Sequence, residues 1–208
     1  MVLGARGASY KDYETHQFSK MGANDSATGP GSRWIRKFDV KNGQDLGKYL
    51  FSLPGQLVGS PVLCVGARLG GEVRAFNTLP QVSLAVGVDF NPGERNPLVM
   101  YGDAHDLHQF KAGSFGSMYS NVIDHIMHID RFASEARRVL VPRGTLLVHM
   151  LHQSLEQDKW AVRDMIKEHK AIDSQIVAAG FEHAVPPLHQ KNYARMLIHK
   201  YVYRSTAK

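Results

Sequence analysis

The chain has 208 residues, a formal net charge of +6 and 43% apolar residues, values that are ordinary for a globular protein. Its length suits one domain with an appendage. No apolar run approaches the roughly 18 residues of a membrane span, and the N-terminus shows no secretory apolar segment. The single cysteine, Cys64, excludes an internal disulfide framework. We therefore expect a cytoplasmic protein that is not bound to a membrane.

The N-terminal part is predicted to form an arm over residues 1–55, followed by one domain over residues 56–208. The segment NDSATGPGS at 24–32 has too little apolar surface to fold alone, and it is predicted to be a mobile loop. Amphipathic residues 44–53 predict a helix that ends before Pro54. The arm either covers a binding site as a lid or packs onto the domain. In the first case Trp34 and Tyr49 are pocket residues.

A strand, a glycine turn and a second strand come next in the chain. Residues 62–65, VLCV, are an apolar run typical of a parallel strand buried on both faces. Gly66 and Gly70 give the following turn its backbone freedom. Residues 84–88 form a second apolar run, which ends in Asp89. A glycine turn followed about 20 residues later by an acid is typical of a doubly wound sheet that binds a nucleoside, with the carboxylate on the ribose.

The identity of the nucleoside is indicated by Arg68. A dinucleotide fingerprint needs a glycine at this position, because backbone must approach a pyrophosphate. The side chain of Arg68 would obstruct that approach, whereas a nucleoside without phosphates does not require it. S-adenosylmethionine (SAM) is such a ligand, an adenosine that carries a sulfonium and an amino acid.

Strands and helices alternate over the rest of the chain. We expect a helix from an N-cap at Asp130 to Leu140, a strand over 145–151, helices over 153–170 and 172–179, and a final strand over 193–203 paired as a hairpin with 181–185. Gly180 should close the last helix. The alternation predicts an α/β fold, a doubly wound and mostly parallel sheet with helices on both faces and an antiparallel C-terminal strand.

Short motifs in a fixed order resemble those of class I SAM-dependent methyltransferases over residues 60–203. They are VGARLG at 65–70, GVD at 87–89, YGDA at 101–104, a fourth strand at 114–121, RRVLVPRGTLLV at 137–148 and AGF at 179–181. The resemblance implies a Rossmann-like sheet, SAM as cofactor and a methyltransferase activity, with Asp89 on the ribose and Asp103 at the adenine. It implies cofactor binding by Gly66, Ala67, Arg68, Gly70, Asp89, Phe90, Asp103, Ala104 and Asn121.

Several positions depart from the family pattern. Cys64 stands where the first motif usually has an acid, and Gly116 where the fourth strand usually has Asp. Arg68 and Arg143 stand where glycines are usual. Loss of the acid removes a group that often organises the methionine end of SAM. Arg68 either reaches the methionine carboxylate in its place or points to solvent.

Histidines follow the third, fourth and fifth strands, at the edge of the sheet where the ligand is expected. An O–H or N–H methyl acceptor must lose a proton, and a histidine near neutral pKa can take it. We expect His125 or His152 to be this base, with Asp124 as its orienter, although each could be a cap or surface residue instead. Asp124, His125 and His128 also have the residue types of a divalent-metal site. Since HxxH arises easily in a chain with 11 histidines, we assign no metal ligand.

The acceptor is predicted to be a small molecule or a sugar. The chain lacks the Asp/Asn-Pro-Pro-Tyr/Phe pattern of amino-group DNA methyltransferases and a catalytic cysteine for carbon-5 pyrimidine methylation. RNA or protein acceptors are alternatives, and the acid-free C-terminal segment would suit RNA. Its basic residues are Lys191, Arg195, Lys200, Arg204 and Lys208. A further alternative is a SAM-binding pseudo-methyltransferase that acts through a partner.

Overall fold

The computed structural model describes residues 9–22, 30–92, 96–151, 165–191 and 197–206. Its helices are α1 (Tyr10–Gly22), α2 (Pro30–Ser52), α3 (Gly71–Phe76), α4 (Ile129–Val139) and α5 (Met165–Ala178), with short 3-10 turns η1 (Gly55–Leu57) and η2 (Ile123–His125). Its strands are β1 (Val62–Val65), β2 (Ala85–Asp89), β3 (Val99–Tyr101), β4 (Phe115–Ser120), β5 (Leu140–Leu151), β6 (Phe181–His183), β7 (Leu188–Lys191) and β8 (Leu197–Ser205).

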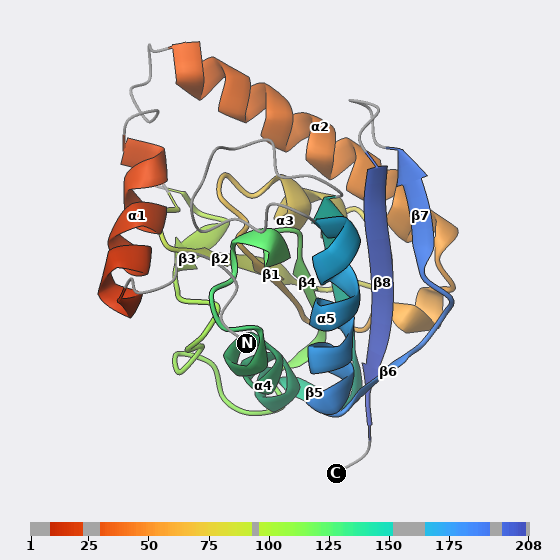
Figure 1. The fold of residues 1–208 in the computed structure, drawn as a ribbon. Coiled ribbons are helices and arrows are strands. Elements are labelled where there is room, and N and C mark those ends of the chain that lie inside the picture. The colour runs from red at the N-terminus through yellow and green to blue at the C-terminus, as the bar shows by residue number, and fades with distance from the viewer. Residues whose placement is uncertain (1–8, 23–29, 93–95, 152–164, 192–196, 207–208) are drawn as a thin grey trace.

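These strands form one sheet in the order β3-β2-β1-β4-β5-β8-β6, and β7 also pairs with β8. The strands from β3 to β5 run parallel, and β8 runs antiparallel to β5. The strand order reverses between β1 and β4, and ligands of open α/β sheets bind at the carboxyl ends beside such a reversal. The predicted doubly wound, mostly parallel sheet with an antiparallel C-terminal strand is confirmed (Figure 1).

Helices cover both faces of the sheet (Figure 1). On one face α4 and α5 bury side chains such as Phe132 and Ile172, and on the other α2 and α3 bury Leu50 and Phe76. All four residues of β1 are buried. A strand covered on both sides has no polar face, which is why the sequence of β1 is a continuous apolar run.

The helices α2 and α3 approach each other closely at two glycines. A Cβ atom on Gly43 would lie 2.6 Å from the backbone oxygen of Gly71, so only glycine fits there. Beside this contact, the Asp39 carboxylate accepts a hydrogen bond from the backbone N–H of Gly71 and pairs with Arg74. The contact holds α2 against the start of α3, next to the glycine turn.

Three helix predictions were wrong in their bounds. Helix α2 begins at Pro30, so it includes residues 30–32 of the predicted loop and starts well before residue 44. Its glycines lower helix propensity, and packing on α3 overrides that preference. Helix α4 has His128 at the N-cap, and Asp130 lies in its first turn without capping it. Helix α5 continues through residues 170–172, while residues 153–164 lie outside the described part.

The predicted antiparallel pairing of residues 181–185 with the final strand is present, but β7 lies between these strands in the chain and also pairs with β8, so they do not form a simple hairpin. Strand β6 pairs antiparallel with β8, and Gly180 precedes it with a φ of 94°, as expected of a residue that ends a helix. The sequence does not predict β7, whose residues LHQK contain one apolar side chain. Residues 193–196 of the predicted final strand lie outside the described part.

Two departures from the family pattern have structural reasons. A Cβ on Gly116 would lie 2.6 Å from the backbone carbon of Gly59, so β4 has no room for an acid at that position. Arg143 has a φ of 60° and therefore adopts the left-handed conformation of the glycine that it replaces. Both residues lie where the register of β4 and β5 shifts, between the pairs Phe115–Leu140 and Ser117–Thr145.

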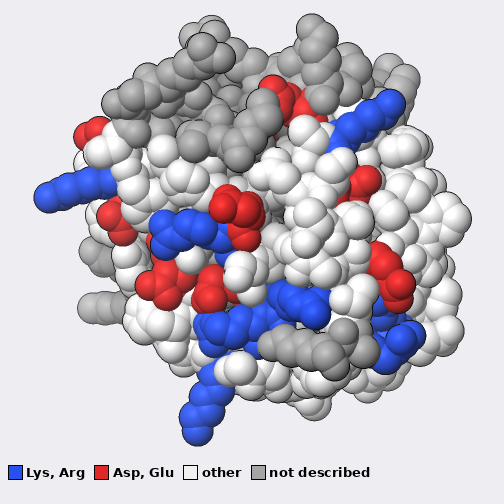
Figure 2. Space-filling view, turned by 60° about the horizontal axis from the view of Figure 1, so that its bottom comes forward, with Lys and Arg blue, Asp and Glu red and all other residues white. Residues whose placement is uncertain are grey.

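Charged residues of both signs are mixed on the surface that Figure 2 shows, where Lys and Arg lie beside Asp and Glu. Two basic residues of the C-terminal segment have partners inside the fold. Lys200 is 3% exposed and stacks over the ring of Tyr49. Arg204 donates to the backbone oxygens of Arg143 and Gln56. These two cations therefore do not form an exposed surface that could bind phosphate groups.

Candidate active site

The glycine turn after β1 folds back onto the end of β2. The backbone N–H groups of Gly66 and Ala67 donate to the oxygen of Val88 at 2.9 and 3.1 Å. The next N–H, of Arg68, donates to the Asp89 carboxylate at 3.0 Å. A Cβ on Gly66 would lie 2.3 Å from a methyl carbon of Val122, so the close approach requires glycine. The turn and Asp89 thus face the same space at the carboxyl edge of the sheet.

That space is an open cleft of about 590 Å³, counting the part that is open to solvent. Six of the predicted site residues line it, and they are Gly66, Arg68, Asp89, Phe90, Ala104 and His125. The remaining lining residues, which were not among the predicted site residues, are Tyr13, Gln17, Val65, Gly102, Val122 and Ile126. Ala67, Gly70, Asp103 and Asn121 are absent from this lining.

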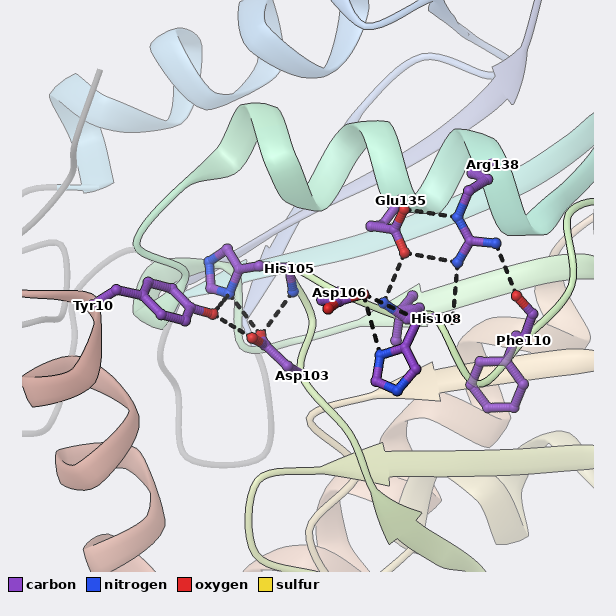
Figure 3. Close-up of polar contacts among 9 residues, drawn as sticks. Tyr10, Asp103, His105, Asp106, His108, Phe110, Glu135 and Arg138 are labelled. Atoms are coloured by element: carbon purple, nitrogen blue, oxygen red, sulfur yellow. Dashed lines mark hydrogen bonds and ion pairs between the residues drawn. The ribbon is translucent and has the colours of Figure 1, made fainter.

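The carboxylate of Asp103 makes contacts away from the cleft lining (Figure 3). One of its oxygens accepts the hydroxyl of Tyr10, and the other accepts the backbone N–H and the ring N–H of His105, both at 2.8 Å. The ring Nε2 of His105 accepts the backbone N–H of His128 at 3.2 Å. These partners place the ring proton on Nδ1, and they lower the pKa of Asp103 although burial opposes the shift. Asp103 therefore ties α1 to the loop after β3.

Helix α1 brings aromatic side chains over the cleft. Tyr13 is 2% exposed, with its ring against those of Phe90 and His105 at centroid distances of 5.9 and 5.5 Å. The ring of Tyr10 packs on His128, and the guanidinium of Arg131 lies over it. Burial and the nearby Asp103 raise the pKa of Tyr10 far above its usual range, so its hydroxyl stays a donor.

The loop after β3 is fixed from its other side by α4 (Figure 3). Glu135 accepts the backbone N–H of Leu107 at 2.7 Å, and Arg138 donates to the backbone oxygens of Leu107 and Phe110 at 2.8 Å. The two side chains also pair with each other through two hydrogen bonds of 2.7 Å. This clamp fixes the backbone at Leu107 and Phe110, in the loop that also contains the cleft residues Gly102 and Ala104.

A buried carboxyl group lies near the end of β4, outside the cleft lining. Asn121, which directly follows β4, donates its side-chain N–H to Glu72 of α3 at 2.9 Å. Burial, and secondly the charge of Asp39, raise the pKa of Glu72 to about 7. The charge of Arg68 acts to lower the pKa of both Glu72 and Asp39. Its guanidinium therefore belongs to this cluster as well as to the cleft lining.

The predicted base and its orienter lie together in the turn η2. His125 lines the cleft, and its Nε2 lies 3.5 Å from a carboxylate oxygen of Asp124, which is 2% exposed. His152 lies outside the described part. His149, at the end of β5, is buried against Tyr49 and accepts from or donates to the Tyr119 hydroxyl at 3.1 Å. Tyr49 therefore packs the arm onto the sheet, and the side chain of Trp34 is not among those described.

Other kinds of site find no support in the described residues. There, no group of three or more His, Cys, Asp or Glu side chains could hold a metal ion, and Asp124, His125 and His128 do not form one. Within the same ranges, no helix is both long and apolar enough to cross a bilayer.

Sequence reasoning missed Tyr13 and Gln17 because it did not predict α1. A signal for the start of this helix exists at Ser9 and Asp12. Each of these side chains accepts the backbone N–H of the other, at 3.0 and 3.2 Å, which is a capping box. The pattern Ser-x-x-Asp therefore marks the start of the helix that covers the cleft.

Residues 63–148 match the family model for a methyltransferase domain. No curated protein sequence matches the chain. Among solved structures, the chain is similar to the 1,6-didemethyltoxoflavin-N1-methyltransferase of Burkholderia thailandensis, with a TM-score of 0.74, 14% identity and coverage of 99% of this chain and 94% of that one. That structure holds 1,6-didemethyltoxoflavin and S-adenosylhomocysteine.

Two further structures share the fold. A SAM-dependent methyltransferase from Mesorhizobium loti has a TM-score of 0.53 and 14% identity over 74% of this chain and 94% of its own. The [4+2]-cyclase SpnF has a TM-score of 0.60 and 14% identity over 78% of this chain and 81% of its own. Residues 63–148 therefore carry a methyltransferase domain, and the chain has the doubly wound fold of these methyltransferase structures.

Proposed function

We propose that the protein transfers the methyl group of SAM to an O or N nucleophile of a small molecule or sugar. The observation that carries this proposal is that His125 lines the same cleft as Asp89 and Gly66. One cleft therefore combines a carboxylate suited to ribose, a glycine turn and a proton acceptor.

The strand order supports one placement of SAM. The adenine lies at Gly102 and Ala104, after β3, beside the ring of Phe90, and the ribose binds Asp89 at the end of β2. Because β1 and β4 follow β2 in the sheet, the methionine end extends over the glycine turn toward Asn121. In this placement Asp103 acts on the adenine through the loop that it holds, since its carboxylate is bonded to Tyr10 and His105.

The reaction is an in-line displacement. The acceptor atom bonds to the methyl carbon as the carbon–sulfur bond breaks, and S-adenosylhomocysteine leaves. The acceptor proton passes to His125, and the buried carboxylate of Asp124 orients that ring. His152 stays the second candidate for the base.

A small acceptor is supported by two observations. The B. thailandensis enzyme, which is similar over 99% of this chain, acts by its name on a single compound. In this protein α1 covers the cleft with Tyr13 and Gln17, which narrows access for a macromolecule. The RNA alternative is less favoured because Lys200 is buried and Arg204 is bonded to backbone oxygens.

A binding protein without methyl transfer is the second candidate. SpnF shares the fold and is by its name a cyclase, so the fold alone does not require methyl transfer. Cys64 in place of the usual acid favours this alternative too.

We also propose that the arm, residues 1–55, covers the domain formed by residues 56–208. The contribution of α1 to the cleft lining supports this division. A cytoplasmic location stays our expectation from the single cysteine.

The acceptor class can be tested with methyl-labelled SAM and a cell extract divided into metabolite, RNA and protein fractions. We expect label in the metabolite fraction. Label confined to RNA or protein would refute a small acceptor, and SAM binding without any transfer would favour the binding protein. With the acceptor known, His125→Ala should lower turnover about 100- to 10,000-fold and change its pH profile. Near-normal turnover with an unchanged profile would exclude His125 as the base.

Cofactor placement is tested by titrating SAM into wild type and Asp89→Ala. Removal of hydrogen bonds to a charged group should weaken binding by about 1.5 to 3 kcal/mol. Unchanged SAM affinity in a folded variant would show that Asp89 does not bind the ribose.

A further inference from the structure

The carboxyl group of Glu72 is buried at the start of α3, where it interacts with Arg68 of the cleft lining, and only one of its oxygens has a hydrogen-bond partner among the described residues. The residue is 5% exposed. Its Oε1 accepts the Asn121 side-chain N–H at 2.9 Å, whereas its Oε2 has no hydrogen-bond partner in the described part of the chain. A buried polar atom without a partner costs about 1 to 3 kcal/mol, and more when it is charged. Such a group points to a ligand that satisfies it.

The groups around Glu72 indicate the charge of that ligand. Glu72 interacts electrostatically with Asp39 of α2, Cys64 of β1, Tyr119 of β4 and Arg68 of the glycine turn. Of these neighbours, Asp39 is an acid that raises the pKa of Glu72 and Arg68 a cation that lowers it. Arg68 lines the cleft, and the Asp39 carboxylate is already bonded to Gly71 and Arg74. Glu72 is therefore the carboxyl group with capacity for one further cation or donor.

The position of Glu72 relative to the strands selects the part of SAM that it meets. Glu72 lies one residue after Gly71, and through Asn121 it is bonded to the segment that follows β4. With adenine at β3 and ribose at β2, only the methionine end extends over β1 and β4. That end has a carboxylate and an α-ammonium, which match one cation and one anion of the protein, Arg68 and Glu72.

We propose that Glu72 binds the α-ammonium group of SAM and selects ligands that carry this group. The proposal rests on the cofactor placement given under Proposed function. The ammonium donates to Oε2, while Oε1 keeps its bond to Asn121. Arg68 is then turned toward the methionine carboxylate instead of solvent. Strand β1 has Cys64 and therefore no carboxylate at this position, and Glu72 of α3 supplies one instead.

The test compares S-adenosylhomocysteine, which has the ammonium, with 5′-methylthioadenosine, which has the same nucleoside and a thioether but no amino-acid end. Both are titrated by calorimetry into wild type, Glu72→Gln and the matched control Glu182→Gln, whose carboxyl is exposed on β6. In Glu72→Gln we expect roughly 10- to 100-fold weaker S-adenosylhomocysteine binding, the equivalent of one hydrogen bond between charged groups. Binding of 5′-methylthioadenosine should be unchanged, which also shows that the variant is folded.

The pH dependence provides a second readout. Since the pKa of Glu72 is raised to about 7 without ligand, and the ammonium prefers the ionised carboxylate, affinity for S-adenosylhomocysteine should rise as pH increases from 5.5 toward 7.5. Glu72→Gln should lose this rise, although Asp39, Cys64, Tyr119 and Arg68 are still present. The control should keep it.

Two outcomes overturn the proposal. If Glu72→Gln weakens both ligands equally, the carboxyl group supports the fold only, and if it weakens neither, the ammonium binds elsewhere. Asp89→Ala separates this proposal from the cofactor placement, because both ligands contain the ribose. If Asp89→Ala weakens the binding of both ligands while Glu72→Gln has no selective effect, the cofactor placement stands and only the proposed role of Glu72 is rejected.

Discussion

The attachment of α1 to the domain can be tested by changing one atom, with Tyr10→Phe. The phenyl ring keeps its contacts with Tyr13 and His128, whose centroids lie 5.5 and 5.9 Å away, so only the hydroxyl is lost. A hydrogen bond to a charged group contributes about 1.5 to 3 kcal/mol. Asp103 keeps both hydrogen bonds from His105, and we therefore expect a loss at the lower end, about 1.5 kcal/mol. This corresponds to an opening of α1 that is about tenfold more frequent.

Two rates measure this opening. Trypsin cleavage after Lys11, which is exposed on α1, requires local unfolding and should become about tenfold faster. Release of S-adenosylhomocysteine, followed by stopped flow, should accelerate by a similar factor if α1 covers the cofactor. Tyr101→Phe is the control, since its side chain is 59% exposed on β3. Faster cleavage with unchanged release would mean that α1 does not retain the cofactor, and unchanged cleavage would mean that the Tyr10 hydroxyl does not hold α1.

Two further predictions concern stability, measured as the free energy of unfolding in urea. Gly43→Ala should lose about 1 to 3 kcal/mol, because its Cβ would lie 2.6 Å from the backbone oxygen of Gly71. In the same helix, the added Cβ of Gly47→Ala meets nothing within 4 Å, so this variant should gain up to about 1 kcal/mol. Equal effects of the two variants would contradict the close contact of α2 and α3. Arg143→Gly should gain up to about 1 kcal/mol, because Arg143 has a φ of 60° that glycine adopts without strain, and a clear loss would show that the side chain stabilises the turn.

The sequence by itself determined the elements whose signal is local. The run VLCV could only be a strand covered on both faces, and the structure buries all four residues of β1. Gly66 and Asp89 could be paired from their spacing alone, because strand–turn–helix–strand units connect in one way. The parallel direction of the central strands follows from the alternation of strands and helices, and with it the edge at which a ligand binds.

The tertiary structure decided what depends on contacts between distant segments. Helix α2 has glycines that argue against a helix, yet Gly43 is required by the backbone of Gly71, which is remote in sequence. The carboxyl group of Glu72 resembles any acid at the start of a helix until Asn121 and Cys64 are placed beside it. Asp103 was expected at the adenine, but Tyr10 of an unpredicted helix occupies one of its oxygens. Local patterns report backbone preference and burial, whereas the partner of a polar side chain is set by which segments the fold brings together.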